Sequence, residues 1–214
     1  MSCWIDCDPS TVSRRYDRLA DLIPAFDRLL FLPKTLRRKG VEALNLRRGD
    51  RVLDVGCGTG VNFSALHEAV GPNGQIFGVD ISPGMLRKAE NLCGAARWSN
   101  ICLYECDAAD LVLPALLDGV LFSLSYNTMS NHRDVLSNVW QQLRLGGRIA
   151  IVDARVPPGR WSKLVLPFAI WLMKHTLLGN PLIQPWKELE QLTPDIDVVT
   201  HQFGSYYICY GVKS

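Results

Sequence analysis

Three carboxylates in or after predicted strands are the residues of this chain best placed to bind a polar ligand. The first, Asp54, interrupts the apolar run at 51–55, and glycines follow it at positions 56, 58 and 60. A buried strand that passes through such a turn into a helix leaves backbone N–H groups free at the helix start, where the helix also carries a partial positive charge. Glycine lets a ligand lie close against the backbone. Residues 51–60 therefore predict a ligand site.

The other two acids extend this site along the chain. Asp80 ends a predicted strand at 75–80, twenty positions after the last glycine of the turn. An acid at that strand tip can accept hydrogen bonds from both hydroxyls of a ribose. Asp107 follows a third predicted strand at 101–104. A dinucleotide fingerprint would need glycine where Val61 stands, so the spacing argues against a nicotinamide-dependent oxidoreductase.

The pattern D-x-G-x-G-x-G resembles the first motif of class I S-adenosylmethionine-dependent methyltransferases, and residues 52–60 match it almost completely. The full set of strand, turn, helix, strand and acid supports the resemblance, because a bare G-x-G-x-G is common by chance. Residues 13–153 and the final Gly-x-Tyr-Tyr-Ile-x-x-Gly are similar to the ubiquinone/menaquinone C-methyltransferases and the bacterial phosphatidylethanolamine N-methyltransferases. The chain departs from the quinone enzymes in its Gly-Cys-Gly turn and through 154–195.

This resemblance implies S-adenosylmethionine as cofactor and assigns roles to the acids. Asp54 would orient the glycine turn and reach the amino-acid end of the cofactor, and Asp80 would hold the ribose. Asp107 would accept from the adenine amino group, while the backbone N–H of Ala108 meets a ring nitrogen. Tyr16 would close over the methionine end. The expected cofactor contacts are Tyr16, Asp54, Gly56, Cys57, Gly58, Thr59, Gly60, Asp80, Ile81, Met85, Cys106, Asp107, Ala108 and Ser123.

The methyl acceptor is less well defined by the sequence. Methyl transfer from a sulfonium is an in-line displacement that needs mainly a well-oriented acceptor in a dry pocket. A base is needed only for an acceptor that holds its proton, and Tyr126 or His132 would then supply it. A helix-capping or solvated role for His132 stays open. Apolar and aromatic residues in 11–46 and 154–192 favour a hydrophobic acceptor such as a quinol, phenolic metabolite, amine or lipid head group, unless they only pack a cap.

Alternating strands and helices predict an α/β fold, and the resemblance implies a Rossmann-like three-layer sandwich with a mostly parallel, seven-stranded sheet. The last two strands are joined by so short a link that they must form an antiparallel hairpin. We expect strands at 51–55, 75–80, 101–104, 118–125, 148–152, 196–203 and 206–212. We expect a single domain over 1–214, with N-terminal cap helices in 11–46, a cofactor-binding core in 47–153, an inserted cap in 154–195 and a closing hairpin in 196–214. In the cap helix at 33–46, Arg37, Arg38 and Lys39 should be exposed.

Composition excludes several classes of protein. The formal net charge of +2 over 214 residues is too small to favour nucleic acid as a partner. Seven cysteines without C-x-x-C spacing, and histidines that do not cluster with cysteine or acid at ligand spacing, indicate reduced thiols and no metal. The N-terminus has no signal-like pattern, so we expect a cytoplasmic chain. The apolar run at 164–173 is too short to span a bilayer, but its basic flanks would allow peripheral contact with anionic lipid.

A second class of function stays open on the sequence alone. A non-catalytic scaffold could bind S-adenosylmethionine or S-adenosylhomocysteine and regulate a partner. The glycine turn, Asp80 and Asp107 report cofactor binding only, so they do not separate this scaffold from an enzyme. Turnover with a panel of quinols, amines, phenols and thiols would separate the two. The oligomeric state is not predicted by any pattern in the chain.

Overall fold

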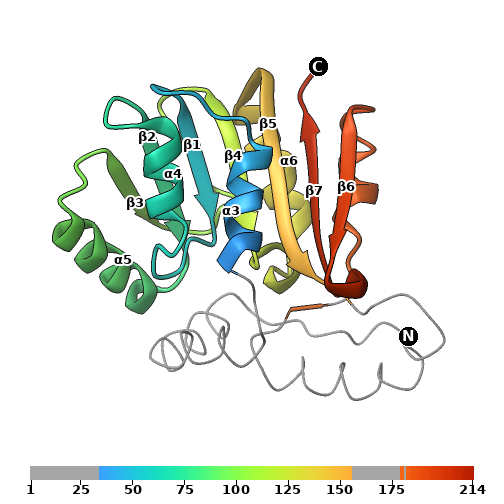
Figure 1. Cartoon of the computed structure of the whole chain (residues 1–214), viewed down its shortest axis with the longest axis horizontal. Helices are drawn as coiled ribbons and strands as arrows, with labels where there is room; N and C mark the ends of the chain where they lie inside the picture. The colour runs from blue at the N-terminus through green and yellow to red at the C-terminus, as the bar shows by residue number, and fades with distance from the viewer. Residues whose placement is uncertain (1–33, 156–178, 181) are drawn as a thin grey trace.

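The structure is a computed structural model, and it describes residues 34–155, 179–180 and 182–214 (Figure 1). The helices are α3 Lys34–Ala43, α4 Phe63–Val70, α5 Pro83–Ala96, α6 His132–Gln142 and α8 Pro185–Leu189, with short 3-10 turns η1 Tyr126–Thr128 and η2 Gln202–Gly204. The strands are β1 Arg51–Val55, β2 Gln75–Asp80, β3 Ile101–Glu105, β4 Leu117–Ser123, β5 Leu143–Ala154, β6 Ile196–His201 and β7 Tyr206–Val212.

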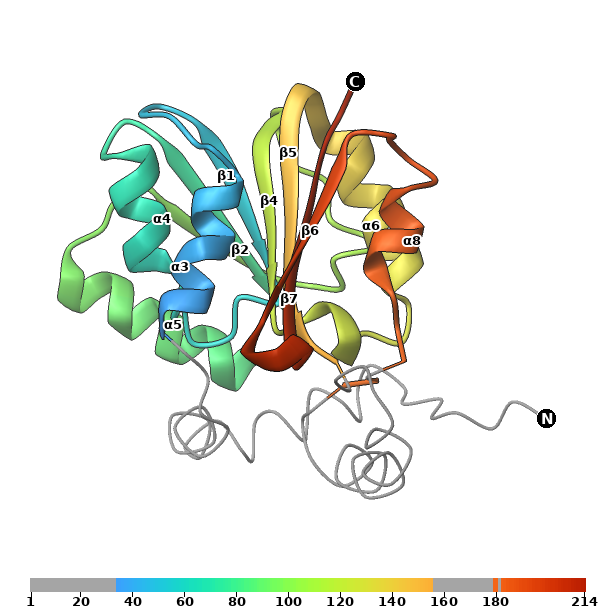
Figure 2. The same cartoon turned by 45° about the vertical axis from the view of Figure 1, so that its right-hand side comes forward.

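The strands form one seven-stranded sheet in the order β3-β2-β1-β4-β5-β7-β6. Strands β1 to β5 pair in parallel, and β7 runs antiparallel to both β5 and β6. Helices α3, α4 and α5 cover one face of the sheet, and α6 and α8 cover the other (Figure 2). The expected three-layer α/β fold with its antiparallel hairpin is therefore confirmed.

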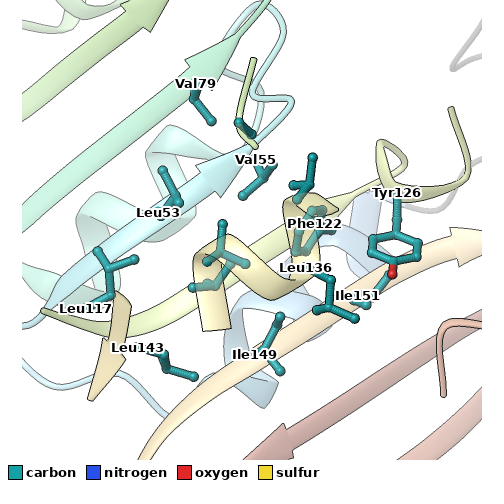
Figure 3. Packing of buried hydrophobic residues seen from close by; sticks show 14 of the residues in the cluster. Leu53, Val55, Val79, Leu117, Phe122, Tyr126, Leu136, Leu143, Ile149 and Ile151 are labelled. Carbon is teal, nitrogen blue, oxygen red and sulfur yellow. The ribbon is translucent and has the colours of Figure 1, made fainter. Parts of the chain in front are cut away.

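Burial on both faces explains why β1 reads as an almost continuous apolar run. Val52 packs into the cluster formed with α3, α4 and α5, whereas Leu53 and Val55 pack into the cluster formed with α6 and α8. All three side chains have no exposed surface. Figure 3 shows the second cluster, in which Phe122 of β4 and Leu136 of α6 meet. Burying each such side chain contributes about 1.5–3 kcal/mol, so this strand anchors both layers.

Several predicted boundaries are wrong by a few residues, and backbone conformation explains two of these differences. The expected strand at 118–125 ends at Ser123, because Leu124 takes a φ of 60°. The expected strand at 196–203 ends at His201, because Gln202 and Phe203 take φ values of 48° and 56° and form η2. A left-handed residue turns the chain out of a strand.

The fifth strand is longer than expected, and one helix is shorter. Strand β5 covers twelve residues rather than 148–152, with Gly146 at a φ of 74° inside it. Helix α8 ends at Leu189, short of the expected 192. Residues 111–116, expected to be helical or irregular, contain no helix.

Some expectations cannot be compared with the structure. The N-terminal part of the predicted cap, residues 11–33, and the inserted segment 156–178 with its apolar run lie outside the described residues. Within the described ranges, no helix is both long and apolar enough to cross a bilayer.

Helix α3 sits close against the sheet because it carries a glycine at its contact with β5. A Cβ at Gly40 would lie 2.3 Å from Cγ2 of Val152, whereas a Cβ at Gly94, on the exposed side of α5, would meet no described atom within 4 Å.

We predict opposite effects of the same substitution at these two helical glycines. Gly40→Ala should lower the free energy of unfolding by about 1–2 kcal/mol, because overpacking outweighs the gain in helix propensity. Gly94→Ala should raise it by up to about 1 kcal/mol through propensity alone. Urea unfolding of both variants measures this, and equal effects would contradict the close packing of α3 on β5.

Candidate cofactor site

The glycine turn between β1 and α4 folds back over the end of β2. The backbone N–H groups of Gly56 and Cys57 both donate to the carbonyl of Val79, at 2.9 and 3.0 Å. Gly56 has a φ of +68°, and a Cβ there would lie 2.6 Å from Cβ of Ser125, so only glycine fits. Gly58 has a φ of +56°, but no described atom lies within 4 Å of a Cβ built on it. Within the part of the chain that the structure describes, the turn therefore leaves open space at its middle glycine.

Asp80, at the end of β2, is held against this turn by its two carboxylate oxygens. Oδ2 accepts from the backbone N–H of Gly58 at 2.8 Å, and Oδ1 accepts from that of Ser82 at 2.9 Å. Each carboxylate oxygen can accept a second hydrogen bond, which fits the two hydroxyls of a ribose. Ser82 caps α5 through Met85 N at 3.2 Å, as its position before Pro83 predicts.

Asp107 lies in the loop after β3 and connects it to the start of α6. Its Oδ1 accepts from the backbone N–H of Ala109 at 2.9 Å, and its Oδ2 accepts from Nδ2 of Asn131 at 2.8 Å. The carbonyl of Ala108 accepts from Nδ2 of Asn138 at 2.9 Å. The sequence analysis missed Asn131 and Asn138. Asn131 stands directly before a helix, which signals a cap, but nothing local indicates its contact with a loop 24 residues away.

Asp54 is fully buried at the end of β1, and burial raises its pKa to about 7. Two interactions lower the pKa of Asp54. Nδ2 of Asn62 donates to the two carboxylate oxygens at 3.2 and 3.0 Å, and Arg37 contributes a positive charge. Oδ1 of Asn62 is buried and has no hydrogen-bond partner among the described residues. A carboxylate beside an unpaired acceptor is suited to a cationic donor such as an ammonium group.

The sequence analysis placed Arg37 wrongly. It was expected on the exposed side of its helix with Arg38 and Lys39, but its side chain is half-buried. Its Nη1 donates to Oγ of Ser123 at 3.0 Å, at the end of β4. The helical pattern gives the direction of a side chain only approximately, and the docking of α3 on β4 and β5 turns Arg37 toward the strand ends.

Asp153, near the end of β5, is a second buried carboxylate at this edge. It accepts from the backbone N–H groups of Asn127 at 3.0 Å and Ala154 at 2.8 Å. Burial raises its pKa to about 7 despite these bonds and the charge of Arg37. Asp153 therefore ties the end of β5 to η1, which follows β4.

Tyr126 and His132, the candidates for a base, both contact Glu188 of α8. The Tyr126 hydroxyl, fully buried in the cluster of Figure 3, donates to Oε2 of Glu188 at 2.6 Å. His132 places Nε2 3.1 Å from Oε1 of Glu188 and Nδ1 3.2 Å from the carbonyl of Met129. Both partners of the imidazole are acceptors, so His132 links Glu188 to the backbone of Met129.

The pKa shifts of Tyr126 and Glu188 make both side chains poor bases for taking a proton from a methyl acceptor. Burial, then the bond to Glu188, raises the pKa of Tyr126 far above its usual value. Burial also raises the pKa of Glu188, but the hydrogen bonds from His132 and Tyr126 outweigh it and the pKa lies below the ordinary value. Glu188 was missed because only the tertiary fold brings α8 against α6.

The parallel register brings most of the predicted cofactor contacts to one edge of the sheet. The contacts at or after the carboxyl ends of β1, β2 and β4 are Asp54, Gly56, Cys57, Gly58, Gly60, Asp80 and Ser123. Cys57 is buried, and burial raises the pKa of its thiol. Met85 is 1% exposed, which places it in the core rather than at a surface for adenine, and Ile81 is half-buried. Thr59 and Cys106 are half-buried as well, and Tyr16 lies outside the described residues.

Comparison with known proteins identifies the family of this chain. A family model described as a methyltransferase domain matches residues 46–193, more than half of the chain. The chain belongs to this methyltransferase domain family. Together with the sheet order, the match confirms the resemblance to class I S-adenosylmethionine-dependent methyltransferases. S-adenosylmethionine is the methyl donor of that class, and the open glycine turn, Asp80 and the Asp54–Asn62 pair fit it.

Similar sequences include demethylmenaquinone methyltransferases. The protein from Geobacillus sp. (strain WCH70) is 27% identical over 147 residues, which cover 68% of this chain and 61% of that protein. The one from Geobacillus stearothermophilus is 31% identical over 147 residues, with the same coverage. The one from Listeria welshimeri is 26% identical over 184 residues, covering 85% of this chain and 75% of that protein. The chain thus spans about three fifths of the length of the two Geobacillus relatives.

Solved structures share the fold at low identity. An S-adenosylmethionine-dependent methyltransferase from Aquifex aeolicus has a TM-score of 0.64 at 19% identity, covering 97% of this chain and 99% of that one. Phosphoethanolamine N-methyltransferase 2 from Haemonchus contortus, solved with S-adenosyl-L-methionine, has a TM-score of 0.64 at 17% identity, covering 78% of this chain and 49% of that one.

The buried Asp54 predicts a specific dependence of stability on pH. Its pKa is about 7 in the folded chain and near 3.8 when exposed, so the folded state holds a proton that the unfolded state loses between these values. Its contribution to stability is therefore present below pH 4 and lost as the pH rises to about 7. About three pKa units correspond to a difference on the order of 4 kcal/mol.

Asp54→Asn removes this titration, so the variant should gain stability relative to the original chain as the pH rises from 4 to 8. Thermal unfolding across this range measures the difference, with Glu68→Gln on the surface as the control. A constant difference between Asp54→Asn and the original chain would contradict the raised pKa.

Proposed function

We propose that this chain transfers a methyl group from S-adenosylmethionine to a small, hydrophobic acceptor by in-line displacement. The observation that carries the proposal is the Asp80 carboxylate at the end of β2, bonded to Gly58 in the glycine turn. This contact joins a ribose acceptor to a turn that is open to a ligand. Membership of the methyltransferase domain family supports the same reaction class.

When bound, the cofactor supplies a methyl group on a positively charged sulfur. The residues of this chain bind and orient it. Asp80 accepts from the ribose hydroxyls, and Asp107 with the backbone of Ala108 binds the adenine edge. Asp54 and Asn62 hold the ammonium end. Holding donor and acceptor in register in a site without water can lower the barrier by about 7–11 kcal/mol, so the chain needs no covalent intermediate.

The chemical class of the acceptor is proposed from the sequence and from the relatives. The names of the Geobacillus and Listeria proteins identify a quinone as their acceptor, and that of the Haemonchus protein identifies phosphoethanolamine. The apolar residues of the segments that flank the core favour the hydrophobic alternative. A panel of quinols, phenols, amines and lipid head groups, with release of S-adenosylhomocysteine as the readout, tests this choice.

A second candidate is a non-catalytic subunit that binds the cofactor and regulates a partner. The hydrogen bonds of both Tyr126 and His132 to Glu188 favour it, because they engage the two candidate bases within the protein. This argument against an enzyme does not apply if the acceptor needs no base. Saturable cofactor binding without turnover on any member of the panel would favour the regulatory subunit.

We predict that Asp80→Asn weakens the binding of S-adenosylhomocysteine by about tenfold to a hundredfold. A hydrogen bond to a charged group contributes about 1.5–3 kcal/mol, and the amide retains one acceptor for the backbone. Isothermal calorimetry measures the affinity, with exposed Asp110→Asn as the matched control. Equal affinities of the two variants would show that Asp80 does not bind the ribose.

We predict that Tyr126→Phe keeps kcat within about tenfold of the original chain while the free energy of unfolding falls by about 1–3 kcal/mol. The loss of stability follows because Glu188 loses a buried hydrogen-bond donor. His132→Gln should behave in the same way. Turnover as a function of pH is the measurement, once an acceptor is found. A loss above a hundredfold together with the loss of a limb of the pH profile would identify a base.

A further inference from the structure

Arg37 extends from α3 to the carboxyl end of β4, which lies between β1 and β5 in the sheet. Its Nη1 lies 3.0 Å from Oγ and 3.5 Å from the carbonyl oxygen of Ser123, at the end of β4. Its charge also lowers the pKa of Asp54 at the end of β1 and of Asp153 at the end of β5. Arg37 is half-buried, so water screens these interactions less than at the surface. One guanidinium thus acts on two acids that are distant in sequence.

The two acids need such a partner because burial disfavours their charged forms. Asp54 is 0% exposed and Asp153 is 5% exposed. The other described groups that act on Asp54 are the neutral amide of Asn62, the residue before α4, and the like charge of Asp80 from β2, which raises the pKa of Asp54. Those that act on Asp153 are the backbone N–H groups of η1 and β5, with Tyr207 and Cys209 of β7 close by. Among these described neighbours, Arg37 carries the positive charge.

We infer that Arg37 is a positioning residue of the cofactor site, whose guanidinium at the end of β4 favours the charged forms of Asp54 and Asp153 on the flanking strands β1 and β5. The inference rests on the proposed function, because ionised Asp54 is the group that would face the ammonium of the cofactor. Protonated Asp54 has lost the charge that a cation needs in a site without water. Arg37 then determines the pH range in which the cofactor binds, without touching the reacting atoms.

The neighbouring arginine provides a matched control. Arg38 lies on the same helix, but its side chain is 58% exposed and pairs with Glu68 at 3.0 Å on the surface. Arg37→Gln removes the buried charge, Arg37→Lys keeps it without the forked geometry, and Arg38→Gln removes a surface charge. Binding of S-adenosylhomocysteine is measured by calorimetry from pH 6 to pH 8 for each variant and for the original chain.

Arg37→Gln should weaken binding by about tenfold at pH 6 and by only about twofold at pH 8, because removal of a nearby opposite charge raises the pKa of a carboxyl by one unit or more. Arg37→Lys should stay within about threefold of the original chain throughout, and Arg38→Gln should match it. The inference is overturned if Arg37→Gln follows Arg38→Gln, or if it weakens binding equally at every pH, which indicates packing or direct ligand contact.

A measurement without the cofactor separates failure of this inference from failure of the proposed function. The loss of thermal stability caused by Arg37→Gln should be larger at pH 8 than at pH 5, because more of the acids are ionised at pH 8. A pH-independent loss overturns the inference even if the cofactor binds. If the original chain binds no S-adenosylhomocysteine, the proposed function fails, while the stability measurement still tests Arg37. Arg37→Met, which keeps the aliphatic stem, replaces Arg37→Gln if that variant does not fold.

Discussion

The burial of negative charge at the carboxyl ends of the strands is the constraint on which the rest of this site depends. Asp54 and Asp153 lie almost completely out of water, where an unpaired carboxylate is costly. Each acid is held by donors from a different element, Asn62 at the start of α4 and the backbone of Asn127 from η1, and both feel the charge of Arg37 on α3. The edge of the sheet and the polar site therefore form together.

The bond between Asp80 and Gly58 shows how the same contacts stabilise the fold and prepare the site. It links the ends of β1 and β2, while the N–H groups of Gly56 and Cys57 bind the carbonyl of Val79 from the same strand. The carboxylate is fixed before any ligand arrives, so little conformational entropy remains to be lost on binding. No atom of the described residues lies within 4 Å of a Cβ built on Gly58, so within this part of the chain a ligand can approach the fixed carboxylate.

The side chains around Glu188 follow a different principle from the acids at the strand ends. Glu188 gathers Tyr126, His132 and the exposed Arg133, and the tyrosine ring packs edge-to-face on Phe122 at 5.1 Å between centroids. These contacts hold α8 against the start of α6 and leave the polar groups engaged with one another. A methyl transfer driven by orientation is compatible with such a wall, since it needs a shaped surface more than a proton acceptor.

The sequence alone determined the alternation of strands and helices, the glycine turn and the acids at the strand tips, because each depends on local pattern and backbone freedom. The tertiary structure decided which side chains meet across the sheet. Arg37 was expected in solvent and instead lies against Ser123, while Asn62, Asn131 and Glu188 gave no local sign of their partners. Their contacts join positions 8 to 86 residues apart, and only the packing of helices on a parallel sheet brings such positions together.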